Sequence, residues 1–193
     1  MRRQIAVLLT LVLASVSLHA TLTIPADFRT VVNDASLIVR GRVTDVRSIE
    51  VPGIGVESVA TLAVENVLKG QASGFVYVRV PGGVIGSRRY VTIGSPAFHV
   101  GQRAILFLRP GAADTAFRPI GLTMGVYPIQ TDPATRKVTV EPPVLGGKTT
   151  GATGAVVRGD QRRLPVSVVE FESLVRLAMA TPPGAVNRGA GGR

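Results

Sequence analysis

Side chains that could act in catalysis are few in this chain of 193 residues. The sequence contains two histidines, His19 and His99, and no cysteine. A zinc site built from histidine and cysteine therefore cannot form within one chain, and a catalytic triad would have to use His99 as its base. No Gly-x-Ser-x-Gly motif supplies a nucleophile to accompany it. We therefore interpret His99 as a loop or strand-end residue.

Two glycine-rich segments match nucleotide-binding motifs only in part. Gly146-Gly147-Lys148-Thr149 has the end of a phosphate-binding loop, but Pro142 stands where the first glycine is required. Gly53-Ile54-Gly55 has the start of a dinucleotide-binding fingerprint, but Ser58 replaces its third glycine. Neither segment predicts a nucleotide cofactor.

The acidic residues offer a second route to catalysis. Aspartate and glutamate together number 12, and they are scattered singly along the chain. A pair such as Asp45 and Glu65 has the chemistry of a glycosidase, but the spacing of the two residues does not favour it. The sequence thus predicts no enzyme, no metal ligands and no cofactor.

The amino terminus is typical of an export signal. Arg2 and Arg3 supply a positive start, an apolar run extends from Ile5 to Val16, and Ala20 is a small residue suited to cleavage. The alternative is a membrane anchor, but a spanning helix needs roughly 20 apolar residues and this run is shorter. We expect a signal peptide over 1–20, cleaved after Ala20, no stable membrane span afterwards, and a periplasmic or secreted bacterial protein.

Positive charge dominates the chain, whose formal net charge is +10. A basic surface attracts acidic glycans, anionic lipid headgroups and nucleic acid. The competing interpretation is that scattered arginines serve solubility. Aromatic residues make up only 5% of the chain, and base stacking requires them, so we expect no specific nucleic-acid partner.

Apolar periodicity predicts a mature domain rich in strands. A short helix is expected over 27–35, and the strands are expected at 37–44, 58–68, 75–80, 88–93, 104–108, 116–120, 125–129 and 137–141. The first strand alternates as a half-buried strand does, with Arg40 and Arg42 opposite its apolar face. The run 104–108 is nearly all apolar, which indicates a strand covered on both faces at the centre of the core.

The carboxy-terminal part has a different composition. Residues 142–164 are rich in Gly and Thr and are expected to form a loop or linker after a domain over 21–141. An amphipathic helix is expected over 165–180, with a capping box at Ser167 and an apolar stripe of Val168, Phe171, Leu174, Val175 and Ala178 that packs on the sheet. Glu172 and Arg176 are spaced as an i,i+4 ion pair. Residues 181–193 are expected to be a disordered tail.

Three segments also resemble a known family. They are Asp34 to Val43 (DASLIVRGRV), Leu62 to Gly70 (LAVENVLKG) and Phe98 to Leu108 (FHVGQRAILFL). Their order is similar to that of the netrin-like module of the tissue inhibitors of metalloproteinases, over roughly Thr21 to Ile129. The resemblance implies an OB-type barrel of five strands flanked by helices. The expected fold class is therefore all-β with minor helices: an OB-like antiparallel β-barrel with a short N-terminal helix and a C-terminal amphipathic helix.

The same resemblance implies a mode of inhibition. In that family the mature amino terminus chelates the zinc of the protease, so Thr21 would be the chelator here and Leu22 the residue in the specificity pocket. The family fixes this terminus with disulfides, which a chain without cysteine lacks. Ordering a free terminus costs on the order of 1 kcal/mol per residue.

Three hypotheses of function follow from the sequence. The first is an exported, noncatalytic binding or interaction domain that holds a protein or polymer through its loops or a barrel face. The second is a metalloprotease inhibitor, whose partner would be a zinc metalloprotease. The third is an enzyme of unrecognised type, which requires a pocket that gathers His99 or several carboxylates. The sequence leaves the ligand and the oligomeric state open.

Overall fold

The computed structural model describes residues 28–111, 115–143 and 165–180. Strands dominate these residues, with a short helix at their beginning and a longer helix at their end. The expected signal peptide 1–20, Thr21, Leu22, the tail 181–193 and most of the expected linker (144–164) lie outside the described residues. Within the described ranges, no helix has the length and apolar character that crossing a membrane requires.

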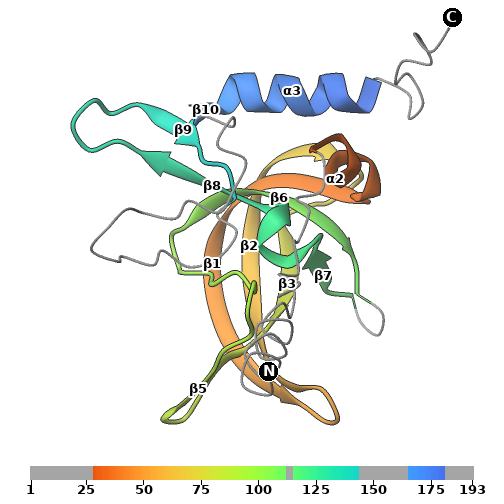
Figure 1. Cartoon of the computed structure of the whole chain (residues 1–193), viewed down its shortest axis with the longest axis vertical. Coiled ribbons are helices and arrows are strands. Elements are labelled where there is room, and N and C mark those ends of the chain that lie inside the picture. The colour runs from red at the N-terminus through yellow and green to blue at the C-terminus, as the bar shows by residue number, and fades with distance from the viewer. Residues whose placement is uncertain (1–27, 112–114, 144–164, 181–193) are drawn as a thin grey trace, which may run out of the picture.

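The elements are labelled in Figure 1. The helices are α2 (Phe28–Asp34), the 3-10 helix η1 (Leu122–Gly125) and α3 (Val168–Ala180). The strands are β1 (Leu37–Val51), β2 (Gly55–Lys69), β3 (Phe75–Pro81), β4 (Gly83–Ile85), β5 (Arg88–Tyr90), β6 (Arg103–Pro110), β7 (Phe117–Pro119), β8 (Val126–Thr131), β9 (Val138–Val140) and β10 (Val166–Ser167).

One sheet contains eight of these strands, in the order β1-β2-β3-β7-β6-β8-β9-β10. Because β1 also pairs with β6, the pairings of β1, β2, β3, β7 and β6 return to the strand at which they start. Within this ring of pairings, β3 and β7 are parallel and the other neighbours are antiparallel. The β8–β9 hairpin continues from β6 and projects to one side of the ring (Figure 1).

β1 and β2 form one long hairpin of two 15-residue strands. The sequence predicts strands at 37–44 and 58–68, and both are found, but each strand continues to the turn at 52–54. The prediction stopped early because the outer half of the hairpin is only partly buried and shows no clean apolar face. Figure 1 shows this outer half extending beyond the other strands of the ring.

Two hydrophobic cores lie on opposite faces of β6. Leu106 and Leu108 pack inside the ring against apolar residues of β1, β2 and β3. Ile105 and Phe107 pack on the other face, in a core that includes residues of α2 and α3. All four side chains are completely buried. The prediction that 104–108 is covered on both faces is therefore confirmed.

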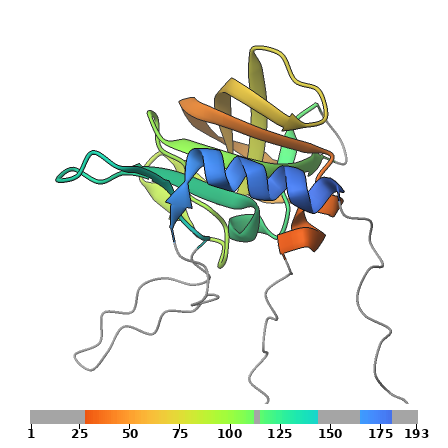
Figure 2. The same ribbon diagram turned by 90° about the horizontal axis from the view of Figure 1, so that it is seen from above.

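Helices α2 and α3 lie over the outer face of the strands, side by side near the carboxyl end of α3 (Figures 1 and 2). Ile38 of β1 is completely buried in the core beneath them. The prediction of a half-buried strand is thus wrong at the start of β1, because a face covered by helices carries apolar residues as well. Phe28, Phe107, Tyr127 and Phe171 form an aromatic cluster with ring centroids 4.8 to 6.3 Å apart.

The carboxy-terminal helix is found, but it starts at Val168, after the two-residue strand β10. The Ser167 hydroxyl accepts a hydrogen bond from the Glu170 main-chain N–H at 3.2 Å, as one half of the predicted capping box requires. Three residues of the predicted stripe are buried, whereas Leu174 is 43% exposed. Leu174 was predicted wrongly because helical spacing alone does not fix the width of the buried face.

β4 and β5 form a separate two-stranded sheet. A strand was predicted at 88–93, but β5 ends at Tyr90, and the residues after it leave Val91 and Ile93 76% and 95% exposed. Its partner β4 was not predicted, because three residues are too few to show alternation. The strands predicted at 75–80, 116–120, 125–129 and 137–141 are found, with ends shifted by one or two residues.

Candidate functional site

The chain crosses the β1–β2 hairpin where β3 leads into β4. At this crossing Gly83 has a φ of 155°, and a Cβ atom there would collide with the hydroxyls of Ser48 and Ser58. A Cβ atom on Gly82 would lie 2.8 Å from the carbonyl oxygen of Tyr90. The crossing therefore requires glycine at both positions. The doublet follows the end of β3 at Pro81 and is a point of close approach between two hairpins.

Serine hydroxyls fix this crossing. Ser58 and Ser95 donate hydrogen bonds to main-chain carbonyls of the crossing, at 2.8 and 2.6 Å. Ser48 accepts a hydrogen bond from the main-chain N–H of Val84 at 2.9 Å. Because each of these hydroxyls has a main-chain partner, the three serines act as structural groups: Ser48 and Ser58 hold the β4–β5 hairpin against β1 and β2, and Ser95 holds the loop after β5 against the end of β3.

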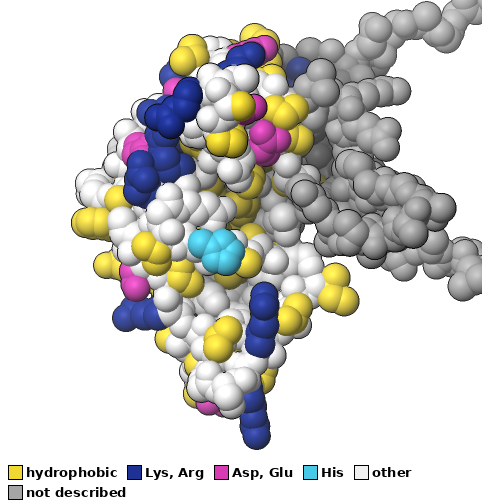
Figure 3. Space-filling view, turned by 90° about the vertical axis from the view of Figure 1, so that its left-hand side faces the viewer, with side chains coloured by type: hydrophobic (Ala, Val, Ile, Leu, Met, Phe, Trp, Pro, Cys, Tyr) yellow, Lys and Arg dark blue, Asp and Glu magenta, His cyan; other side chains and the backbone are white. Residues whose placement is uncertain are grey.

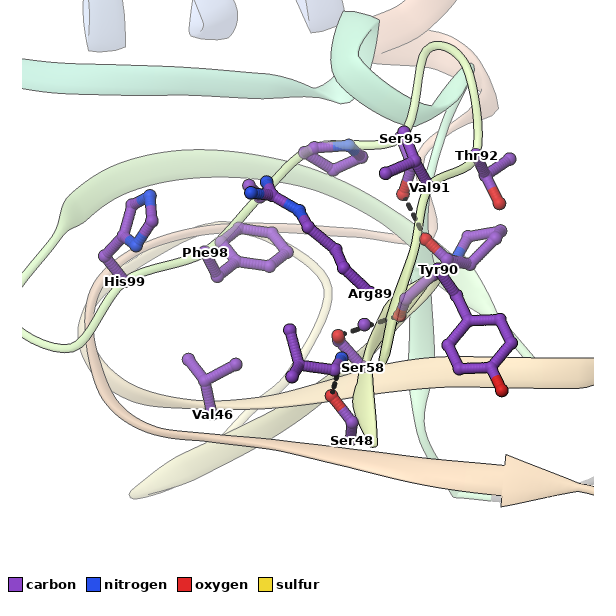
Figure 4. Close-up of a pocket in the computed structure, with 16 residues that line it drawn as sticks. Val46, Ser48, Ser58, Arg89, Tyr90, Val91, Thr92, Ser95, Phe98 and His99 are labelled. Carbon is purple, nitrogen blue, oxygen red and sulfur yellow. Dashed lines mark hydrogen bonds between the residues drawn. The ribbon is translucent and has the colours of Figure 1, made fainter. Parts of the chain in front are cut away.

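A cavity of about 520 Å³ opens beside the crossing. We name it the Arg89 pocket, because Figure 4 shows the Arg89 side chain extending from β5 across it toward Phe98. Phe98 is only 7% exposed and belongs to the core inside the ring, so it gives the pocket a fixed apolar wall. Among the described residues that line the pocket, Arg89 and His99 are the basic side chains and none is a carboxylate. The pocket therefore suits an anionic group.

His99 is exposed in the loop before β6, as interpreted from the sequence. Its main-chain N–H donates to the Gln102 side-chain oxygen at 3.1 Å, and its carbonyl accepts from the Gln102 N–H at 3.0 Å. The Gly101 N–H donates to the carbonyl of Val43 at 2.8 Å, which fixes this turn to β1. Within the described part of the chain, no hydrogen bond or ion pair joins the imidazole to a hydroxyl or a carboxylate. Among the residues that the structure describes, His99 thus has none of the partners that a triad needs.

A second cavity, of about 610 Å³, adjoins the first, and His99 lines both. We name it the Arg42 pocket. Arg42 and Arg103 line it from β1 and β6, while Gln130 and Thr131 line it from the end of β8. The described residues of this lining include no carboxylate and no Phe, Tyr or Trp. Guanidinium, imidazole, amide and hydroxyl groups are therefore the polar side-chain groups of its lining.

Glu65 lies next to this pocket, among three arginines. Arg103 donates to its carboxylate at 2.6, 2.9 and 3.2 Å, and the Nε atoms of Arg40 and Arg42 lie 3.4 and 3.9 Å away. The hydrogen bond from Arg103 is the main cause that lowers the pKa of Glu65 below its usual value of 4.5, and the three positive charges act in the same direction. Arg103 is therefore paired, whereas Arg42, 52% exposed, has only the longest of these contacts.

Glu172 of α3 extends the same network. Its carboxylate receives hydrogen bonds from Arg40 at 2.5 Å and from Asn66 at 3.1 Å, and it lies 3.4 Å from Arg176. The predicted i,i+4 pair with Arg176 is found, but the shorter contacts reach β1 and β2, which helical spacing could not reveal. With Glu65 included, four guanidinium groups face two carboxylates, so the network has net positive charge.

The carboxylates considered for glycosidase chemistry lie apart. Asp45 pairs with Thr61, four residues along β2 from Glu65, which corresponds to roughly 13 Å at 3.3 Å per residue. Glycosidases need about 5 to 9.5 Å. Glu57, the most buried carboxylate among the described residues, is bound by arginines of β3 and β7 at 2.7 and 2.8 Å. No three histidine, aspartate or glutamate residues of the described ranges gather in a way that could hold a metal ion.

No family model and no curated protein sequence matches this chain. Of the residues singled out in the sequence, His99 borders both pockets, while Thr21 and Leu22 lie outside the described residues, so the inhibitor hypothesis stays a prediction. Arg89 and Arg42 were missed as site residues because each appears in the sequence as one of many scattered arginines. The doublet Gly82-Gly83 was the signal that could have indicated a close crossing of the chain there.

Proposed function

We propose that this chain is an exported, noncatalytic binding domain that holds an anionic group of its ligand in the Arg89 pocket. In this proposal the ring of β1, β2, β3, β7 and β6 is an OB-like β-barrel, antiparallel except for β3 with β7. The closed order of pairings and the apolar core inside it support the barrel. The export signal over 1–20 supports a location in the periplasm or the medium.

The observation that carries the proposal is an arginine in a cavity without a counter-charge. Arg89 is permanently cationic, and the described lining of its pocket contains no carboxylate to neutralise it. A ligand carboxylate, sulfate or phosphate would gain a charge-assisted hydrogen bond there, which contributes about 1.5–3 kcal/mol. Phe98 and Tyr90 line the same pocket and offer apolar surface to the rest of the ligand.

The hydrogen-bond partners of the polar groups in the pocket favour binding over catalysis. The three serine hydroxyls of the pocket are engaged with the main chain, and His99 has no orienting carboxylate within the described part of the chain. General acid–base catalysis needs a group positioned and tuned for proton transfer. The described residues of the pocket therefore support recognition of charge and shape.

The test is a titration of the full chain with glucuronate, followed by the amide NMR signals of Tyr90, Val91 and His99. We expect these signals to shift with glucuronate and to remain unchanged with glucose, which has no charge. Arg89→Gln should weaken glucuronate binding at least about tenfold. Arg88→Gln is the matched control, because Arg88 is the exposed neighbour on β5 outside the described lining of the pocket. Equal binding by the two variants would overturn the proposal.

A further inference from the structure

The two pockets lie next to each other on one face of the molecule. They share His99, so a ligand that leaves one pocket along this residue enters the other. Figure 3 looks onto this face: the histidine side chain, in cyan, lies between a group of dark-blue basic side chains above it and further basic side chains below it. The face thus offers positive charge at intervals along a continuous surface.

Each pocket also has one arginine that is available to a ligand. Arg89 has no ion pair with any described residue. Arg42 is half exposed and lies 3.9 Å from Glu65, whose carboxylate is already held by Arg103 at 2.6 Å. An exposed contact at 3.9 Å is weak, so Arg42 can turn to a ligand at little cost. The two available charges therefore line two pockets that share His99.

From this arrangement we infer that the ligand is a linear acidic polysaccharide that occupies both pockets. One carboxylate or sulfate pairs with Arg89, the chain passes His99, and a later acidic group pairs with Arg42. The inference rests on the proposed function and adds the class of ligand to it. Two linked contacts raise the affinity of a polymer above that of its single unit, because the second contact forms within the complex.

The lining favours sugars over nucleic acid. Single-stranded nucleic acid binds through aromatic platforms on which successive bases stack, and the described lining of the Arg42 pocket contains no Phe, Tyr or Trp. The Arg89 pocket has two aromatic side chains, Phe98, which is 7% exposed, and Tyr90, which is 42% exposed, so it offers one exposed ring and no row of stacking platforms. The Arg42 pocket instead offers the amides of Gln102 and Gln130 and the hydroxyl of Thr131, which can bond to sugar hydroxyls.

The experiment measures binding of galacturonate oligomers with one, three and six units to the full chain by calorimetry. We expect the hexamer to bind at least about tenfold more tightly than the monomer. Arg42→Gln should abolish this gain with length, while Arg89→Gln should weaken the binding of both the monomer and the hexamer. Arg88→Gln serves again as the control, and melting curves show that each variant is folded.

Two results separate this inference from the function on which it rests. If the monomer binds at Arg89 but the hexamer binds no more tightly, the polysaccharide inference is overturned and the proposed function stands. If Arg89→Gln leaves monomer binding unchanged, the proposed function itself fails. A single-stranded oligonucleotide of the same charge that binds more tightly than the hexamer, at equal salt, would overturn the assignment to polysaccharide.

Discussion

Replacing Glu172 with alanine removes the main polar contact between α3 and the strands. The carboxylate binds Arg40, Asn66 and Arg176, and its side chain is 9% exposed. Removing one partner of a buried ion pair costs about 3–5 kcal/mol when the other charge is left fully buried. Arg40 keeps Glu65 at 3.4 Å and is 23% exposed, so we expect Glu172→Ala to lower the free energy of unfolding by about 2–3 kcal/mol.

Urea denaturation and thermal melting of the full chain measure this loss. The melting temperature should fall by about 4–12 °C, since each kcal/mol corresponds to about 2–4 °C in a chain of this size. The matched control is Glu50→Ala, because Glu50 is exposed on β1 and has no ion pair with any described residue. That control should change the free energy of unfolding by less than about 0.5 kcal/mol.

A double-mutant cycle with Arg40→Ala tests the cause. If the ion pair is responsible, the double variant should be more stable than the sum of the two single losses predicts, by about 1–2 kcal/mol. Strictly additive losses would refute the reasoning, and so would a Glu172→Ala protein as stable as the Glu50→Ala control. The second result would mean that apolar packing alone holds α3 in place.

Three further predictions concern the cores and the charge network. Phe107→Ala should lower the free energy of unfolding in urea by about 3–5 kcal/mol, because a completely buried ring is removed from the aromatic cluster. Gly41→Val should lower the melting temperature markedly, because a Cβ atom there would lie 2.5 Å from the carbonyl oxygen of Ala63; an unchanged melting curve would contradict this. Glu65 has a lowered pKa in the folded state, so its contribution is present above pH 4.5, the usual pKa, and is lost as the pH falls through the lowered value. The stability difference between the wild type and Glu65→Gln should therefore shrink below about pH 4.5 in urea titrations, whereas a constant difference would count against it.

The parts of the fold that the sequence predicts are those in which one residue type repeats on a buried face. Val76, Val78 and Val80 of β3 alternate as predicted, and all three are buried inside the ring. The run around Leu106 is apolar on both faces because a core lies on each side of β6. In both strands the surface that covers the apolar face continues along the whole strand. The spacing of apolar residues in the sequence therefore indicates directly which side chains are buried.

Prediction failed where burial depends on an element distant in the sequence. Ile38 is buried because α3, more than 100 residues later, covers that face of β1. The outer half of the β1–β2 hairpin has no such cover, so its residues carry no clear pattern although the strands continue. The crossing at Gly83 depends on Ser48 and Ser58 in the earlier hairpin. No local window of sequence contains these pairs of elements.

Net charge alone does not identify the candidate site, but the partners of the arginines together with their position beside a cavity do. Five arginines of the described residues lie within 3.4 Å of a glutamate carboxylate and form ion pairs with it. They are Arg40, Arg79, Arg103, Arg118 and Arg176. Arg42 and Arg89 lack such a close partner and line the two pockets that meet at His99. Both side chains are exposed and line a cavity, so an anionic ligand that enters it meets a guanidinium group without a close counter-charge. The placement of these two arginines therefore favours a ligand over solubility as the reason for their charge.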